Sequence, residues 1–345
     1  MNASETGDRP GGSAPGLALL ATGGTIACTR GANGMAPTLG AEDILRAVEA
    51  DLPCPVVASR DVFMMDSSNV QPEEWCALAR AAEAALQSSD GVVITHGTDT
   101  MAYTASALSF MLAGTRKPVV LTGSQLPLEH PLSDARSNLL HAFTAAMQGV
   151  GGVYVSFDYK LISGVRCVKT HTTAMDAFSS INGPLAGHFD VDGVHFDHPQ
   201  PFTPPENAER RLRATLDPSV FLLKLIPGTS PEVLRFVKDM GYRGLVIEAF
   251  GLGGLHYIRR NLVRALRELE ESGAEVLVVS QCLHEKADLR MYEVGHSMLQ
   301  PHVHSGYDMT TEAAVCKLMW ALGQENPQSW LRQAIVGEYS EPKRI

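Results

Sequence analysis

Short apolar runs alternate with longer helical patterns along this chain, and this alternation limits the folds that it can adopt. Four such runs lie in the first half of the sequence, at residues 17–20, 92–94, 119–121 and 153–155. Runs of this length are typical of strands that are buried on both faces of a parallel sheet. Helical patterns lie between them, at 41–50, 72–86, 101–112 and 133–147. The alternation predicts βαβ units with right-handed crossovers and helices on both faces of the sheet.

The alternation stops at residues 188–218, which are polar and contain five prolines, and resumes beyond them. Apolar runs then recur at 221–223, 245–247 and 276–279, with helical patterns from 231 and at 259–271, 311–322 and 328–336. The sequence therefore predicts an α/β protein in which a long linker joins a larger N-terminal parallel-sheet domain to a smaller C-terminal α/β domain. The predicted boundaries are a disordered tail at 1–16, the first domain at 17–195, the linker at 196–218 and the second domain at 219–345.

Composition excludes several classes of protein. The chain has 345 residues, of which 45% are hydrophobic and 19% charged, so it can bury enough apolar surface to fold. Its formal net charge of -10 argues against a nucleic-acid partner, which requires a basic surface. No apolar run approaches the roughly 20 residues that a membrane helix needs, so no membrane partner is expected either.

The N-terminal segment and the cysteines indicate a cellular location. Residues 1–16 lack the basic region and the apolar core of a signal peptide. The 6 cysteines are scattered and form no CxxC pair, which indicates reduced thiols rather than a disulfide framework. We therefore expect a cytoplasmic protein.

The first apolar run ends in the loop ATGGTIA, at residues 21–27. Two glycines between two threonines allow a tight turn with exposed N–H groups beside a hydroxyl. Acyl transfer needs this combination of a nucleophile and donors to the oxyanion. A plain strand-to-loop turn, in which the hydroxyls form local hydrogen bonds, is the simpler interpretation of this motif taken alone.

A second loop with threonines and a glycine, ITHGTDT at residues 94–100, ends another apolar run. Asp99 in this loop either caps the following helix or holds the ammonium group of a substrate. Ligands of open parallel sheets bind where strands end, so two such loops in one domain together indicate a site. No GxGxxG motif follows a strand, and GLGG at 251–254 is too short to indicate a dinucleotide site.

The segments ATGGTIA (21–27) and ITHGTDTMAYTASALSFML (94–112) resemble the two signature segments of the bacterial L-asparaginases, and the second is especially similar to the cytoplasmic type I branch. Shorter matches occur at 65–68, 121–125, 168–171, 176–178, 226–230 and 280–282. The resemblance runs from residue 17 to about residue 335. It implies hydrolysis of L-asparagine to L-aspartate and ammonia without a metal or cofactor, by a homo-oligomer that is a dimer or a tetramer.

The resemblance also implies which residues catalyse the reaction. Thr25 corresponds to the nucleophile, and Thr98, Asp99 and Lys169 correspond to a cluster in which the lysine helps to deprotonate a threonine. A lysine acts as a base only in its neutral form, which burial favours. The apolar stretch before Lys169, in which Arg166 is the only other charge, is compatible with either a buried or a surface lysine. Our hypothesis is a buried Lys169 that is ion-paired to Asp99, with Thr98 between the lysine and the substrate.

Four further residues correspond to substrate-binding positions of the family. Asp66, Ser67 and Ser68 match the loop that binds the α-carboxylate and the amine of the substrate. Ser124 matches a position whose backbone meets the leaving amide.

Two positions depart from the family pattern. Met35 stands where the family usually has a tyrosine on the loop after the first threonine, and a thioether cannot relay a proton. Either another residue replaces that tyrosine, with Tyr103 and Tyr307 as candidates, or the loop acts only as a lid. Glu248 stands where type I relatives have an arginine of a regulatory asparagine site. A carboxylate there would repel the carboxylate of the effector, so we expect no activation by asparagine.

A metal site is not expected, although several candidate ligands lie close together in the sequence. His296, His302 and His304 lie near Asp308 but lack the ordered spacing of three or four ligands that zinc requires.

Three other functions compete with asparagine hydrolysis. L-Glutamine differs from asparagine by one methylene, which a pocket discriminates by only about 1–3 kcal/mol. An amidase subunit of an archaeal transamidation complex would require an additional N-terminal domain and a docking partner. A non-catalytic regulator that binds an amino acid is disfavoured by the joint presence of Thr25, Thr98, Asp99 and Lys169.

Overall fold

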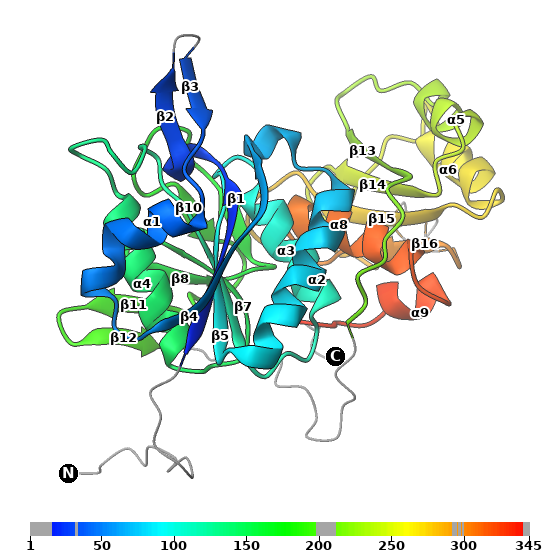
Figure 1. Ribbon diagram of the computed structural model, residues 1–345. Coiled ribbons are helices and arrows are strands. Elements are labelled where there is room, and N and C mark those ends of the chain that lie inside the picture. Colours follow the sequence, from blue (N-terminus) through cyan, green and yellow to red (C-terminus); the bar gives the residue numbers. More distant parts are fainter. Residues whose placement is uncertain are drawn as a thin grey trace.

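The computed structural model describes residues 16–31, 34–197, 212–291, 295, 298 and 300–340. A large N-terminal domain is built on a mostly parallel sheet, and a smaller C-terminal domain on a fully parallel one (Figure 1). This is the predicted α/β architecture. In the described part of the chain, no helix is both long and apolar enough to cross a membrane.

The sheet of the first domain has eight strands, of which five are parallel to one another. The remaining three, at one edge, pair in the antiparallel direction. In sheet order the strands are β12 (Gly193–Phe196), β11 (Gly187–Asp190), β8 (Lys160–Ser163), β7 (Gly152–Phe157), β6 (Pro118–Thr122), β5 (Gly91–Thr95), β1 (Leu17–Gly23) and β4 (Val56–Met65).

Helices cover both faces of this sheet. The side chains of β1 alternate between two cores: Ala18 and Leu20 join one core, and Leu17 and Leu19 join the other. The first core is closed by α2 (Pro72–Ser88) and α3 (Met101–Met111), and the second by α1 (Ala41–Val48) and α4 (Ala135–Met147). Pro72 occupies the first turn of α2, where its missing N–H leaves no hydrogen bond unmade.

The second domain has four parallel strands with helices on both faces. Helix α8 covers one face and packs against α3 of the first domain, so a single apolar core extends across the two domains. Helices α5 and α6 cover the other face. The elements are β13 (Val220–Lys224), α5 (Glu232–Asp239), β14 (Gly244–Ala249), α6 (Leu262–Glu270), β15 (Glu275–Ser280), β16 (Val303–Ser305), α8 (Thr311–Leu322) and α9 (Pro327–Leu331).

Among the residues that the structure describes, two short hairpins lie outside the large sheets. The first, β2 (Cys28–Gly31) with β3 (Gly34–Pro37), projects from the body of the first domain (Figure 1). The second, β9 (Cys167–Lys169) with β10 (Phe178–Ser180), follows β8. The second hairpin carries a predicted catalytic residue, Lys169.

Some elements differ from those predicted. The sequence analysis did not predict β4. Its apolar residues, at 56–58 and 62–65, are interrupted by three polar residues, and all of its residues are partly or fully exposed. The expected loss of regular structure from His188 onward is wrong for residues 188–196, where β11 and β12 complete the sheet edge. The predicted tail lies outside the described residues except for Gly16, and so does the middle of the predicted linker. Residues 212–218 run without helix or strand, and the backbone N–H of Arg213 donates to the carbonyl of Met111.

Candidate active site

The loop after β1 and the loop after β5 pack against each other through glycines. Gly24 has a φ of 77°, and a Cβ at this position would lie 2.3 Å from the backbone nitrogen of Gly97. Only glycine allows so close an approach of two backbones at a positive φ. Thr25 follows Gly24, is partly exposed and begins a short 3-10 turn. Thr98 follows Gly97 and is buried. The contact between the glycines therefore brings the two predicted catalytic threonines into one region.

A third loop, after β4, joins these two. A Cβ on Gly97 would lie 2.6 Å from the hydroxyl of Ser67, and the hydroxyl of Thr100 donates to the Ser67 carbonyl at 2.7 Å. Ser67 is buried, whereas Asp66 and Ser68 are exposed. The N–H of Ser68 donates to the Asp66 carboxylate at 2.8 Å, which lowers the pKa of that carboxyl and keeps it ionised.

The charge of Asp66 extends to the loop that carries Thr25. Burial, together with the negative charge of Asp66, raises the pKa of the Cys28 thiol, and Cys28 lies at the end of the 3-10 turn that Thr25 begins. Its thiol donates to the carbonyl of Gly24 at 3.4 Å. Asp66 can thus attract a cationic group of a ligand that lies beside the Thr25 turn.

Lys169 reaches the second threonine from the β9–β10 hairpin. Its Nζ donates to Thr98 Oγ1 at 2.8 Å and to Asp99 Oδ1 at 2.6 Å. The lysine side chain is 16% exposed and that of Asp99 is 62% exposed. The lysine is thus partly exposed rather than buried, which corrects that part of the hypothesis, whereas its ion pair with Asp99 and its contact with Thr98 match this geometry. The alternative role of Asp99 as a helix cap does not, because Thr100 is the residue at the N-cap of α3.

The loop after β6 supplies a fourth side of the site. Ser124 is buried and its hydroxyl donates to the Leu126 carbonyl. The neighbouring Gln125 donates from its amide nitrogen to the carbonyls of Thr172 and Ala174, at 3.1 and 2.8 Å, on the loop between β9 and β10. Sequence reasoning gave Gln125 no role, and its contacts link the fourth loop to the hairpin that carries Lys169.

A buried histidine supports the loop that carries Thr98. His96 is fully buried, and burial lowers its pKa to about 4, so the ring is neutral near pH 7. Its Nδ1 lies 2.8 Å from the carbonyl of Gly97, which can only accept, so Nδ1 carries the proton. Its Nε2 therefore accepts from Thr104, whose hydroxyl accepts from the indole of Trp75. This chain of hydrogen bonds orients the Gly97 carbonyl; the sequence motif that contains His96 indicated no role for it.

Two family models match the chain almost from end to end. Residues 16–202 match the N-terminal domain of asparaginase, and residues 219–335 match the C-terminal domain of glutaminase/asparaginase. The chain belongs to the asparaginase/glutaminase family.

Individual members of the family are similar to this chain over nearly all of its length. An L-asparaginase from Thermococcus kodakarensis is 42% identical over 327 residues, which are 93% of this chain and 98% of the relative. A glutamyl-tRNA(Gln) amidotransferase subunit from Archaeoglobus fulgidus is 37% identical and covers 94% of this chain, which spans 79% of that relative.

Solved structures support the same membership. The thermostable L-asparaginase from Thermococcus kodakarensis superposes with a TM-score of 0.87 at 41% identity, covering 94% of this chain and 99% of the other. L-asparaginase I from Vibrio cholerae has a TM-score of 0.84 at 30% identity, covering 95% of this chain and 100% of the other. This asparaginase-family chain therefore shares the complete two-domain fold of these enzymes.

Met35, which stands where the family usually has a tyrosine, lies on the projecting β2–β3 hairpin. Met35 is on β3, pairs with Arg30 and is 51% exposed. Neither tyrosine considered as a replacement is in the four loops of the site. Tyr103 packs against the core between α3 and α8, and burial raises its pKa to about 12. Tyr307 packs against Tyr339 in the second domain.

The candidate regulatory position is occupied by contacts within the chain. Glu248, on β14, accepts a hydrogen bond from the hydroxyl of Thr311 and forms an ion pair with Lys224 at 3.2 Å. The expected lack of activation by asparagine stays a prediction.

The histidines considered as metal ligands form other contacts. His302 and His304 both bind the carboxylate of Glu275, at 2.8 and 2.7 Å, and Asp308 pairs with Arg166. His296 lies outside the described residues. Within the described ranges, no group of three or more His, Cys, Asp or Glu residues could hold a metal ion.

Proposed function

We propose that this chain is an L-asparaginase that hydrolyses L-asparagine to L-aspartate and ammonia. The observation that carries the proposal is the contact of Lys169 Nζ with both Thr98 and Asp99, beside the loop of Thr25. The 42% identity to an L-asparaginase over almost the whole of both chains supports the same activity.

In the first step, the hydroxyl of Thr25 attacks the carbon of the side-chain amide. A threonine hydroxyl is a weak nucleophile at neutral pH, so a base must accept its proton. In this proposal Thr98 passes this proton on to Lys169, and Asp99 stabilises the ammonium group that results. The 2.8 Å between Thr98 Oγ1 and Lys169 Nζ is within the reach of direct proton transfer, and the 2.6 Å between Lys169 Nζ and Asp99 Oδ1 is the distance of an ion pair.

In the second step, the tetrahedral intermediate loses ammonia and leaves an ester on Thr25. The leaving nitrogen takes the proton that the hydroxyl gave up. Backbone N–H groups of the glycine-rich turn are suited to stabilise the oxyanion. Water then attacks the ester, aspartate leaves, and Thr25 regains its proton. No step requires a metal or a cofactor.

Asp66, Ser67 and Ser68 bind the amino-acid end of the substrate in this proposal. The ionised carboxylate of Asp66 is suited to the substrate ammonium group, and the hydroxyl groups of the adjacent serines are suited to the substrate carboxylate. The backbone of Ser124, on the fourth loop, is proposed to meet the leaving amide. L-Glutamine is a secondary substrate, because it presents the same two ends and differs only in length.

The similarity to a glutamyl-tRNA(Gln) amidotransferase raises a second candidate function, the release of ammonia within a complex that acts on tRNA. Free asparagine is the discriminating substrate. An asparaginase releases ammonia from it as an isolated protein, whereas a component that works only within a complex does not.

The decisive experiment measures ammonia release from L-asparagine, and from L-glutamine at the same concentration, by the purified protein. The Thr25→Ala variant is expected to lose at least about a thousand-fold in kcat, because it lacks the attacking oxygen. Thr29→Ala is the matched control, because Thr29 lies in the adjacent hairpin and its hydroxyl contacts only Thr38 among the hydrogen bonds described. Full activity in Thr25→Ala would contradict the mechanism, and an inactive wild-type protein that still binds asparagine would identify a regulator.

We further propose a cytoplasmic homo-oligomer, a dimer or tetramer, of the type I branch. The similarity to L-asparaginase I of Vibrio cholerae supports the branch, and six free cysteines support a reducing compartment. The domain boundaries at 17–195 and 219–345, with a linker at 196–218, are part of the same proposal.

A further inference from the structure

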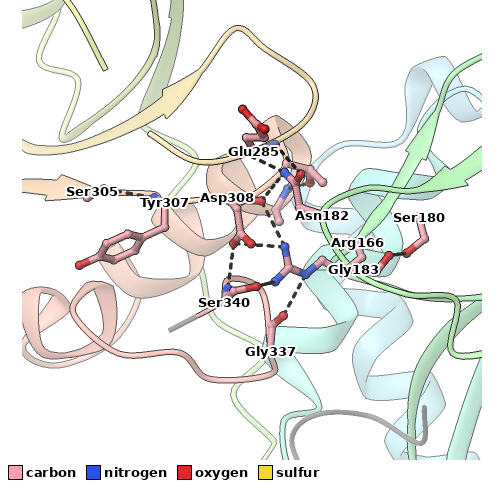
Figure 2. A network of polar contacts seen from close by, with 12 residues as sticks. Arg166, Ser180, Asn182, Gly183, Glu285, Ser305, Tyr307, Asp308, Gly337 and Ser340 are labelled. Atoms are coloured by element: carbon pink, nitrogen blue, oxygen red, sulfur yellow. Dashed lines mark hydrogen bonds and ion pairs between the residues drawn. The ribbon is translucent and has the colours of Figure 1, made fainter. Parts of the chain in front are cut away.

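The hairpin that carries Lys169 is attached at its base to the second domain. Strand β9 begins one residue after Arg166, and β10 ends two residues before Asn182. The backbone N–H of Ile181 donates to the carbonyl of Arg166 at 2.8 Å, which closes the base of the hairpin. Figure 2 shows the side chains of Arg166 and Asn182 pointing from this base toward Asp308 of the second domain.

Arg166 makes the more extensive of the two attachments. Its side chain is only 8% exposed. Nε donates to the carbonyl of Gly337 at 3.1 Å, and Nη1 donates to the carbonyl of Asp308 at 3.2 Å and lies 3.3 Å from its carboxylate (Figure 2). The N–H of Ser340 donates to the same carboxylate at 2.8 Å. The guanidinium group thus joins the hairpin both to the loop before α8 and to the C-terminal segment, which contains Gly337 and Ser340.

Asn182 attaches the other end of the hairpin to the same part of the second domain. Its amide nitrogen donates to the carbonyl of Asp308 at 3.0 Å, and its amide oxygen accepts from the N–H of Glu285 at 2.7 Å. Gly183 leaves room for the arginine, because a Cβ there would lie 3.3 Å from Arg166 Cγ. Both ends of the hairpin therefore converge on Asp308.

We propose that Arg166 is a positioning residue, which holds Lys169 at bonding distance from Thr98 by fixing the β9–β10 hairpin to Asp308 and the C-terminal segment of the second domain. The inference rests on the proposed function, because it assigns Arg166 a role in asparagine hydrolysis. Lys169 lies three residues after Arg166, at the end of β9, whose pairing with β10 spans only Cys167–Lys169. A rotation at the base of so short a hairpin moves its far end, and displacements of about 1 Å can lower rates about 100-fold.

The first domain also holds the hairpin, so loss of Arg166 should loosen it without releasing it. Lys160 Nζ donates to the carbonyl of Phe178 at 2.8 Å and remains when Arg166 is replaced. The substrate-binding loop at Asp66 and Ser67 follows β4 in the large sheet and has its own contact with Thr100. Substrate affinity should therefore be preserved while the rate of the chemical step falls. A purely structural role of Arg166 would instead lower stability and leave the rate of the folded enzyme unchanged.

The test compares Arg166→Met with the wild type in kcat, in KM for asparagine and in amide hydrogen exchange of residues 167–180. We expect kcat to fall by about 10- to 100-fold with KM changed by less than about threefold, and faster exchange in the hairpin. Arg166→Lys retains a positive charge for Asp308 but loses the several N–H donors of the guanidinium group, so we expect a smaller loss of the same kind. This variant replaces Arg166→Met in the test if Arg166→Met does not fold.

Trp320→Phe is the matched control, because it weakens a different contact between the domains, the stacking of Trp320 of α8 on Phe110 of α3. It is expected to lower thermal stability and leave kcat within about twofold of the wild type. Unchanged kcat in both Arg166 variants, or an equal loss of kcat in Trp320→Phe, overturns the proposal. If the wild type does not hydrolyse asparagine, the proposed function is refuted instead. In that case, slow amide hydrogen exchange of residues 167–180 in Arg166→Met would also refute the attachment of the hairpin by Arg166.

Discussion

Compared with the loops that carry Thr25 and Thr98, the hairpin that carries Lys169 is held in place by a different kind of contact. The loops follow buried strands of the large sheet, and Gly24 and Gly97 pack backbone against backbone. The hairpin lies outside that sheet, and side-chain hydrogen bonds to the second domain hold its base. Backbone packing tolerates no added atom, whereas side-chain hydrogen bonds can be removed one at a time. The two parts of the site should therefore respond differently to substitution.

Within the hairpin, the largest effect is expected from removing its reactive group. Lys169→Met keeps much of the length of the side chain but leaves Thr98 and Asp99 without the amine, so kcat should fall by about 100- to 10,000-fold. Steady-state ammonia release measures this loss. Lys224→Met, which removes a lysine that is 63% exposed in the second domain, is the control and should retain activity. A Lys169→Met enzyme with the wild-type rate would remove the hairpin from the chemistry.

A smaller loss of rate, together with a loss of stability, is expected when the backbone contact between the loops of Thr25 and Thr98 is disturbed. Gly24→Ala would place a Cβ 2.3 Å from Gly97 at a φ of 77°, so the loops must separate. We expect about 2–4 kcal/mol of destabilisation and a loss of about 100-fold in kcat. Urea unfolding and ammonia release measure the two effects. In Gly193→Ala the φ is also positive, at 115°, but nothing lies within 4 Å of the added Cβ. Equal losses in both variants would show that backbone strain alone, rather than loop contact, accounts for the result.

The smallest effect concerns His96, which supports the loop of Thr98, and it is a change in the free energy of unfolding at acidic pH. The pKa of His96 is about 4 in the folded protein, against 6.5 for an exposed histidine, so the unfolded chain takes up the proton first. The free energy of unfolding should then fall as the pH drops from 6.5 to 4, by about 1.4 kcal/mol per pH unit and about 3 kcal/mol in all. Above pH 6.5 this contribution is fully present.

Urea unfolding of the wild type and of His96→Asn at several pH values isolates this contribution. The asparagine amide nitrogen can replace the Nδ1 donor to Gly97 and does not titrate, and the lost hydrogen bond of Nε2 to Thr104 lowers stability by the same amount at every pH. The difference in unfolding free energy between the two proteins should therefore vary between pH 6.5 and 4 and stay constant above that range. A constant difference throughout would contradict the low pKa of His96.

The alternation of apolar runs and helices was enough to predict the α/β class and the larger first domain, because strands buried on both faces have few polar residues. The same criterion failed for β4, whose residues are all partly or fully exposed, and for β11 and β12, which contain polar residues and few buried ones. The position of Lys169 beside Thr98 and Asp99 came from the resemblance to a family, since the residues around Lys169 are compatible with either location.

The contacts that support the site could not be predicted from local sequence patterns. Arg166 and Asp308 are 142 positions apart, and neither lies in a motif that predicts the other. The role of His96 depends on the hydroxyl of Thr104 and the indole of Trp75, which only the packing of α2 on α3 brings together. Such pairs become visible only when the chain has folded.

The apolar core that continues from α3 to α8 makes the two domains a single thermodynamic unit. Phe110 is fully buried and stacks on Trp320 of α8, so separation of the domains would expose apolar surface on each of them. Lesions near the carboxyl terminus, although distant from Thr25 in the sequence, would consequently lower the abundance of active enzyme in the cell.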